Sequence, residues 1–217
     1  MRAVRELLGN RRGQFVTRSW LSTSVTPGAA CYIPLAHTAP GAPDQLDREQ
    51  ALTRLKPWLE DSGKGKVLQN AKYDQHVFAN HGIALAGIAH DTMLQSYVLE
   101  SDKGHDLGQL SSRHLGLATI AYEDLCGKGA KQIGFDQVDV ERAAAYSAED
   151  ADLTLRVHRV LHPRFAGEAG LSYVYHSLEL PAQQVIWRME RNGVLVDAAA
   201  LARQSHELGQ KIMALEA

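Results

Sequence analysis

The chain has 217 residues, of which 45% are hydrophobic and 22% charged, as in ordinary globular proteins. Its formal net charge of −2 argues against a polybasic tail and against nucleic-acid binding that rests on bulk positive charge alone, but it does not exclude nucleic-acid binding. The only two cysteines, Cys31 and Cys126, exclude a disulfide framework and a four-cysteine zinc site. The sequence has no apolar signal segment and no run near the roughly 20 apolar residues that span a membrane, so it favours a cytoplasmic protein.

Residues 1–28 differ in composition from the rest of the chain. They contain five arginines between Arg2 and Arg18 but no aspartate, and Glu6 is the only acid before residue 28. Trp20-Leu21 is a weak strand signal because the alternation around it is poor. We therefore treat 1–28 as an atypical N-terminal segment that ends at the Pro27-Gly28 turn.

The remainder of the first half predicts short strands separated by helices. Apolar runs bounded by turn residues indicate strands near 29–35 and 66–69. Helical spacing of apolar residues, with capping residues at the ends, indicates helices over 44–60, 70–81, 92–99 and 106–115. In this scheme Asn70 and Asp91 are the N-caps of the second and third helices.

The second half is predominantly helical. We predict helices over 139–161, closed by Pro163, over 171–192, and over 198–217. Short strands followed by long helices predict an α/β or α+β fold.

Asp150 lies on the side of the 139–161 helix where an apolar residue is expected. At about 100° per residue, Asp150 and Tyr146 point away from the charged arc of this helix and toward Leu153 and Val157. A buried carboxylate is costly unless it is hydrogen-bonded or binds a metal. Two interpretations follow: a structural aspartate satisfied by its neighbours, or a metal ligand with the Tyr146 hydroxyl one turn away to orient a water.

The segment Asn70-Ala71-Lys72-Tyr73-Asp74 also has two interpretations. Asn70 can be a simple helix cap, with Asp74 favoured by the helix dipole. Alternatively, an amide and a carboxylate stand at the end of a strand, a common place for ligands in α/β sheets. Lys128, in the Gly127-Lys128-Gly129 loop, is either a contact for a nucleic-acid backbone or an ordinary solvated lysine.

Several separate segments, in order, resemble the 3′–5′ proofreading exonuclease domain of bacterial family A DNA polymerases. The resemblance runs from about Cys31 to the C-terminus. It is carried by Tyr32-Ile33-Pro34-Leu35-Ala36-His37, Leu68-Gln69-Asn70-Ala71-Lys72-Tyr73-Asp74, Asp91-Thr92-Met93-Leu94, Gly127-Lys128-Gly129 and Tyr146-Ser147-Ala148-Glu149-Asp150-Ala151-Asp152. Glu190-Arg191-Asn192-Gly193-Val194 resembles the first helix and turn of the polymerase domain.

The resemblance implies a ribonuclease-H-like fold over 29–168, followed from 169 to 217 by the truncated start of a polymerase domain. It implies that Asp74 and Asp150 approach each other as ligands of Mg²⁺ or Mn²⁺, with Tyr146 positioning the attacking water. Asn70 and Gln69 would lie near the 3′-terminal nucleotide of single-stranded DNA, and Tyr122 and Lys128 would contact the strand. The implied activity is hydrolysis of 3′-terminal phosphodiester bonds with two metal ions.

The chain departs from the family at the first exonuclease motif. The family carries an Asp-x-Glu pair on its first strand, in the region that corresponds here to 1–28, and that region holds no Asp. We therefore expect a broken or truncated copy of an exonuclease, inactive or crippled. The alternatives are an active exonuclease in which Glu6 or another acid replaces the pair, and a non-catalytic DNA-binding or structural module.

Overall fold

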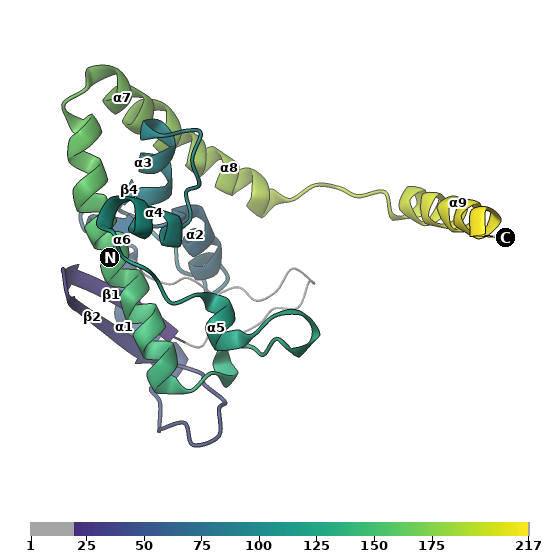
Figure 1. Ribbon diagram of the computed structural model, residues 1–217, viewed down its shortest axis with the longest axis horizontal. Coiled ribbons are helices and arrows are strands. Elements are labelled where there is room, and N and C mark those ends of the chain that lie inside the picture. Colours follow the sequence, from purple (N-terminus) through teal and green to yellow (C-terminus); the bar gives the residue numbers. More distant parts are fainter. Residues whose placement is uncertain (1–19, 217) are drawn as a thin grey trace. The chain divides into compact units, whose positions relative to one another are not determined.

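The computed structural model describes residues 20–216, and Glu6 lies outside the described residues. The chain divides into two compact units, one up to Trp187 and one from Arg188. The elements labelled in Figure 1 are β1 (Trp20–Thr26), β2 (Ala29–Pro34), α1 (Arg48–Leu59), β3 (Lys66–Leu68), α2 (Ala71–Ala79), β4 (Ile88–Asp91), α3 (Thr92–Leu99), α4 (Leu107–Leu115), α5 (Tyr122–Cys126), α6 (Val140–Ala166), α7 (Ala169–Tyr173), α8 (Leu180–Asn192) and α9 (Ala198–Glu216).

Two pairs of strands give the first unit its β-structure. β1 and β2 form an antiparallel hairpin, in which Trp20 stands opposite Pro34. β3 and β4 pair in parallel. The mixed helix-and-strand architecture confirms the predicted α/β class.

The β1–β2 hairpin spans the boundary that composition placed at residue 28. Trp20-Leu21 begins a seven-residue strand although the alternation there is poor. Tertiary packing explains this strand. Trp20 and Leu21 are both buried but belong to different hydrophobic clusters, so both faces of the strand are covered. Gly28 takes a positive φ of 81° in the turn, and its N–H donates to Asp152 Oδ1 of α6 (2.6 Å).

Helix α6 is the element against which much of the first unit packs. It contacts the hairpin, α3 and α4, and Figure 1 shows it running past the hairpin. The predicted end at Leu161 was wrong, because α6 continues through Pro163 to Ala166. Phe165 is fully buried, with its ring 4.8 Å from that of Tyr175, and this packing favours the extra turn despite the missing proline N–H.

The predicted helix over 171–192 is not continuous. Residues Val174–Glu179 form a π-helical turn between α7 and α8. This turn contains Tyr175, whose side chain is fully buried, and helical periodicity alone gives no signal for the change in winding. In the second unit, α9 exposes Leu208, Ile212 and Met213.

Four histidines gather where β4, α6 and the π-helical turn meet. The ring centroid of His90 lies 4.5 Å from that of His158 and 4.7 Å from that of His162, and His176 lies 6.1 Å from His90. Burial, followed by repulsion from His162 and His176, lowers the pKa of His90 to about 4. Burial, with repulsion from His90, His162 and Arg159, lowers the pKa of His158 to about 3.

These lowered pKa values predict that the fold loses stability as the pH falls below 6.5. The unfolded chain then binds protons on His90 and His158, whereas the folded chain does not until the pH approaches 4 and 3. Both rings are partly exposed, so solvent screening reduces the effect, and we expect a loss of about 2 kcal/mol between pH 7 and pH 5.

Urea unfolding at the two pH values measures this loss. Between pH 7 and pH 5, the free energy of unfolding of His158→Gln should fall by about 1 kcal/mol less than that of the unmodified chain. The substitution removes one titrating ring, and the two proteins have all other ionisable groups in common. The same pH dependence in both proteins would contradict the assignment to the histidines.

Candidate active site

Asp150 and Tyr146 lie one turn apart on the buried side of α6. Both are 6% exposed, as the predicted face of this helix requires. Together with Tyr122, the first residue of α5, they line a cavity of about 320 Å³. The other residues of its wall are Asp106, Leu107, Gly108, Thr119, Ile120 and Ala121. The structure therefore brings three sequence-predicted residues to one cavity.

An aromatic cluster supports this cavity. The rings of Tyr122 and Tyr146 meet edge to face, with centroids 6.3 Å apart. The ring centroid of Phe135 lies 5.8 Å from that of Tyr146 and 3.7 Å from that of Trp20 of β1, with the Phe135 and Trp20 rings tilted by 31°. Such packing fixes both tyrosine rings against the hairpin.

The wall of the cavity is acidic. It contains the carboxylates of Asp106 and Asp150, and no lysine or arginine is among the described residues that line it. Asp106 also caps α4 by accepting from the N–H of Gln109 (2.9 Å). These carboxylates repel an anionic phosphodiester, and cations between the two would offset the repulsion.

Asp74 is buried in the first turn of α2, with 1% of its surface exposed. It is not among the described residues that line the cavity, so its approach to Asp150 stays a prediction. Among residues 20–216, no three Asp, Glu, His or Cys side chains are grouped as metal ligands.

Asn70 does not cap α2 with its side chain, which corrects the simple cap prediction. Asn70 has a left-handed backbone, with φ of 60°, and makes no side-chain cap bond. The cap is supplied by Asp91, which accepts from the N–H groups of Asn70 (3.1 Å) and Ala71 (2.8 Å). Asp91 also caps α3 as predicted, by accepting from the N–H of Met93 (2.9 Å).

Gln69 and Lys128 are not among the described residues that line the cavity. Gln69 is buried, donates to the carbonyl of His105 (2.8 Å) and accepts from the Thr92 hydroxyl. Lys128 is exposed and forms an ion pair with Glu123, and this bond raises the pKa of the lysine. Their contacts with a DNA strand stay predictions.

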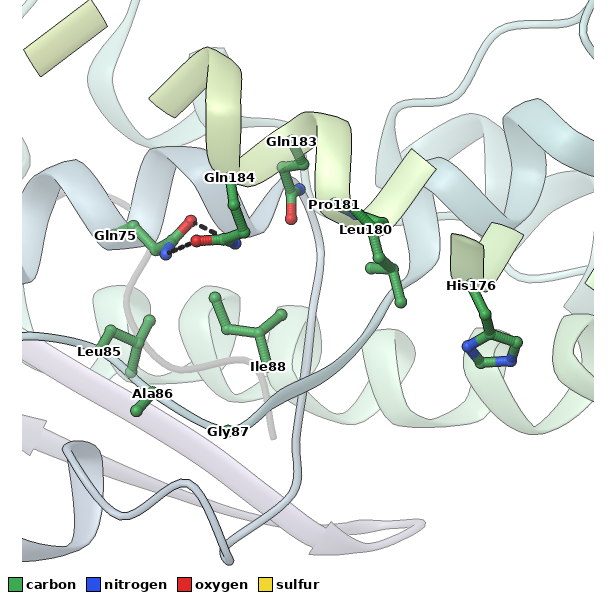
Figure 2. A pocket seen from close by; sticks show the side chains of 10 residues that line it. All are labelled: Gln75, Leu85, Ala86, Gly87, Ile88, His176, Leu180, Pro181, Gln183 and Gln184. Carbon is green, nitrogen blue, oxygen red and sulfur yellow. Dashed lines mark hydrogen bonds between the residues drawn. The ribbon is translucent and has the colours of Figure 1, made fainter. Parts of the chain in front are cut away.

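A second cavity, of about 310 Å³, lies between α2, the segment before β4, and α8 (Figure 2). Gln75 of α2 and Gln184 of α8 exchange two amide hydrogen bonds at 2.8 and 3.1 Å. Figure 2 shows Gln183 beside them on the same helix. Sequence reasoning missed this amide contact, because glutamines at helical spacing carry no signal of their distant partners.

A family model described as 3′–5′ exonuclease matches residues 15–166. The chain belongs to the 3′–5′ exonuclease family of DNA polymerase I. This exonuclease family generally uses divalent metal ions. DNA polymerase I of Pseudomonas aeruginosa is 51% identical over 199 residues, which cover 90% of this chain and 22% of that protein. DNA polymerase I of Rhizobium leguminosarum is 44% identical, over 86% of this chain and 19% of that protein.

This exonuclease chain thus spans about a fifth of the length of the relatives it matches. Among solved structures, the POL domain of Pol1 from M. smegmatis, in complex with DNA primer-template and dNTP, matches with a TM-score of 0.66. That match is 24% identical and covers 90% of this chain and 29% of the other. No helix in the described part of the chain is long and apolar enough to cross a membrane.

Proposed function

We propose that the chain is the 3′–5′ proofreading region of a DNA polymerase I and that the cavity beside Asp150 receives the 3′ end of a single DNA strand. One observation carries this proposal: Asp150, Tyr146 and Tyr122, which the family resemblance singles out, line one cavity. In this assignment the Tyr146 hydroxyl orients the attacking water, and the ring of Tyr122 stacks on a base. The water oxygen attacks the terminal phosphorus, and the 3′ oxygen of the preceding nucleotide leaves.

We propose further that hydrolysis is crippled in this sequence. Residues 1–28 contain no aspartate, so the Asp-x-Glu pair of the family is missing there. Metal ions would offset the repulsion between a phosphodiester and the acidic wall of the cavity. Asp74 and Asp150 alone cannot hold Mg²⁺ or Mn²⁺ ions about 3.5–4 Å apart.

The natural partner, in this proposal, is the remainder of a polymerase chain. Glu190-Arg191-Asn192-Gly193-Val194 resembles the start of a polymerase domain. Val194 and Leu195, which follow α8, are almost fully exposed, as expected of a segment that packs against further protein.

We also propose a cytoplasmic location. Both cysteines are unbonded, which fits the reducing cytoplasm.

Single-stranded DNA binding without catalysis is the second candidate function. It is favoured by the placement of Tyr122 at the cavity, because base stacking needs no metal ion. This candidate overlaps with the first, because a crippled exonuclease that still binds single strands is also a binding module without catalysis.

Replacing Tyr122 tests the binding of single strands directly. Stacking on an aromatic ring is worth about 1–3 kcal/mol per base, so Tyr122→Ala should weaken binding of a fluorescent single-stranded oligonucleotide about tenfold. Tyr97→Ala is the matched control, since Tyr97 is 47% exposed and stacks on His105 instead of the cavity residues. Equal affinities for the Tyr122 and Tyr97 variants would contradict the assigned DNA site.

A further inference from the structure

Asp91 is a fully buried carboxylate at the junction of two helix starts. Its two oxygens accept from the N–H groups of Asn70 (3.1 Å) and Ala71 (2.8 Å) at the start of α2, and of Met93 (2.9 Å) and Leu94 (3.4 Å) in α3. A single side chain thereby satisfies N–H groups at the beginning of two helices. The positions of α2 and α3 are consequently tied to one another through Asp91.

A third element is tied to the same residue. Gln183 of α8 donates its Nε2 to Asp91 Oδ2 at 2.6 Å, and the N–H of Asp91 donates to the Tyr175 hydroxyl at 2.9 Å. Tyr175 is fully buried and Gln183 is 6% exposed. Figure 2 shows Gln183 on the side of α8 that faces the strand segment and α2. Helix α8 is therefore joined to Asp91 through a buried amide–carboxylate bond.

The backbone that Asp91 holds is in an unfavourable conformation. Asn70 is the only non-glycine among the described residues with a positive φ, and its own side chain does not cap α2. The conformation of Asn70 therefore depends on hydrogen bonds from outside the turn. Asp91 supplies one of them by accepting from the N–H of Asn70. Asp74 follows one helical turn later, so the same bonds set where its carboxylate stands.

We infer that Asp91 is a positioning residue. Through its hydrogen bonds, the position of the Tyr175–Gln183 segment determines the position of the Asn70–Asp74 turn. The inference rests on the proposed function in one respect, the membership of Asp74 in the exonuclease site. α8 continues into the residues that resemble the start of a polymerase domain. A change in how α8 is held is thereby transmitted to the exonuclease turn through two hydrogen bonds.

The test compares Gln183→Met with Leu180→Ala in the full chain. Met keeps the length of the Gln183 side chain but removes its bond to Asp91. Leu180→Ala removes apolar contact at the start of α8 and leaves that bond in place. NMR records hydrogen exchange at the amides of Asn70 and Ala71 and the carboxylate carbon signal of Asp74.

We expect Gln183→Met to raise exchange at these two amides about tenfold and to shift the Asp74 signal, because a charge-assisted bond is lost. Leu180→Ala should change exchange less than twofold and leave the Asp74 signal in place. Equal responses to the two variants, or no response at Asn70 and Ala71, would overturn the inference. Tyr175→Phe provides a second variant if Gln183→Met does not fold, and the same two amides should respond to it.

These readouts do not depend on nuclease activity. If the Asp74 signal shifts, but Asp74→Ala does not slow cleavage by a protein whose N-terminus has been replaced by a family-like strand carrying Asp-x-Glu, the coupling would be upheld and the role proposed for Asp74 in catalysis refuted. An unchanged Asp74 signal would refute the coupling alone.

Discussion

Replacing residues 1–19 by a family-like strand that carries Asp-x-Glu should raise Mg²⁺-dependent release of 3′ nucleotides at least about 10³-fold. This factor corresponds to about 4 kcal/mol of transition-state stabilisation. In the proposed function, the two added carboxylates would complete the metal-ligand set to which Asp74 and Asp150 are assigned.

In this strand-restored protein, Asp150→Ala should return cleavage to the background. Asp152→Asn is the matched control, because Asp152 lies on the same helix but forms an exposed-side ion pair with Arg156 at 2.7 Å. It should cleave within a few-fold of its parent. Equal losses from the two substitutions would show that α6 tolerates no change there, and the assignment of Asp150 as a ligand would fail.

Asp91→Ala should be the most destabilising single substitution at a polar residue, at about 3–5 kcal/mol. It removes the acceptor of four backbone N–H groups and of the Gln183 amide, all at a fully buried position. A buried donor that loses its partner costs its full desolvation free energy. The cost is larger here because the lost acceptor is a charged carboxylate.

Asp106→Ala is the comparison that isolates burial at position 91. Asp106 is also an aspartate N-cap, but it is exposed and caps only one helix, through the N–H of Gln109. Its loss should cost about 1 kcal/mol in urea unfolding. Similar costs for the two substitutions would contradict the account of Asp91 as a shared cap.

Local sequence signals predicted α1, α3, α4 and the start of α6 well, because each of these helices carries its own periodicity and an aspartate cap. Asp106 before α4 and Asp139 before α6 accept hydrogen bonds from their own helices, as capping residues should. The failures come where distant contacts decide. Asn70 is a good cap by composition, but Asp91, 21 residues away, takes over its role.

The same limit applies to the candidate site. Helical spacing predicted that Asp150 and Tyr146 point away from the charged face of α6, and both are buried in the structure. Asp106 and Thr119 in the cavity wall could not be foreseen, since they reach it from loops and helix ends that carry no periodic signal. The continuation of α6 past Pro163 depends on the burial of Phe165 beside Tyr175, which local sequence does not encode.

In the proposed function, the chain keeps the cavity beside Asp150 but lacks the acids needed to cut DNA there. Release of labelled 3′ nucleotides from a single-stranded oligonucleotide, in millimolar Mg²⁺ or Mn²⁺, tests it most directly. We predict that the unmodified chain releases nucleotides no faster than its Asp150→Ala variant. Rapid metal-dependent release that Asp150→Ala abolishes would contradict the account, and Glu6 would then be the first candidate for the replacement ligand.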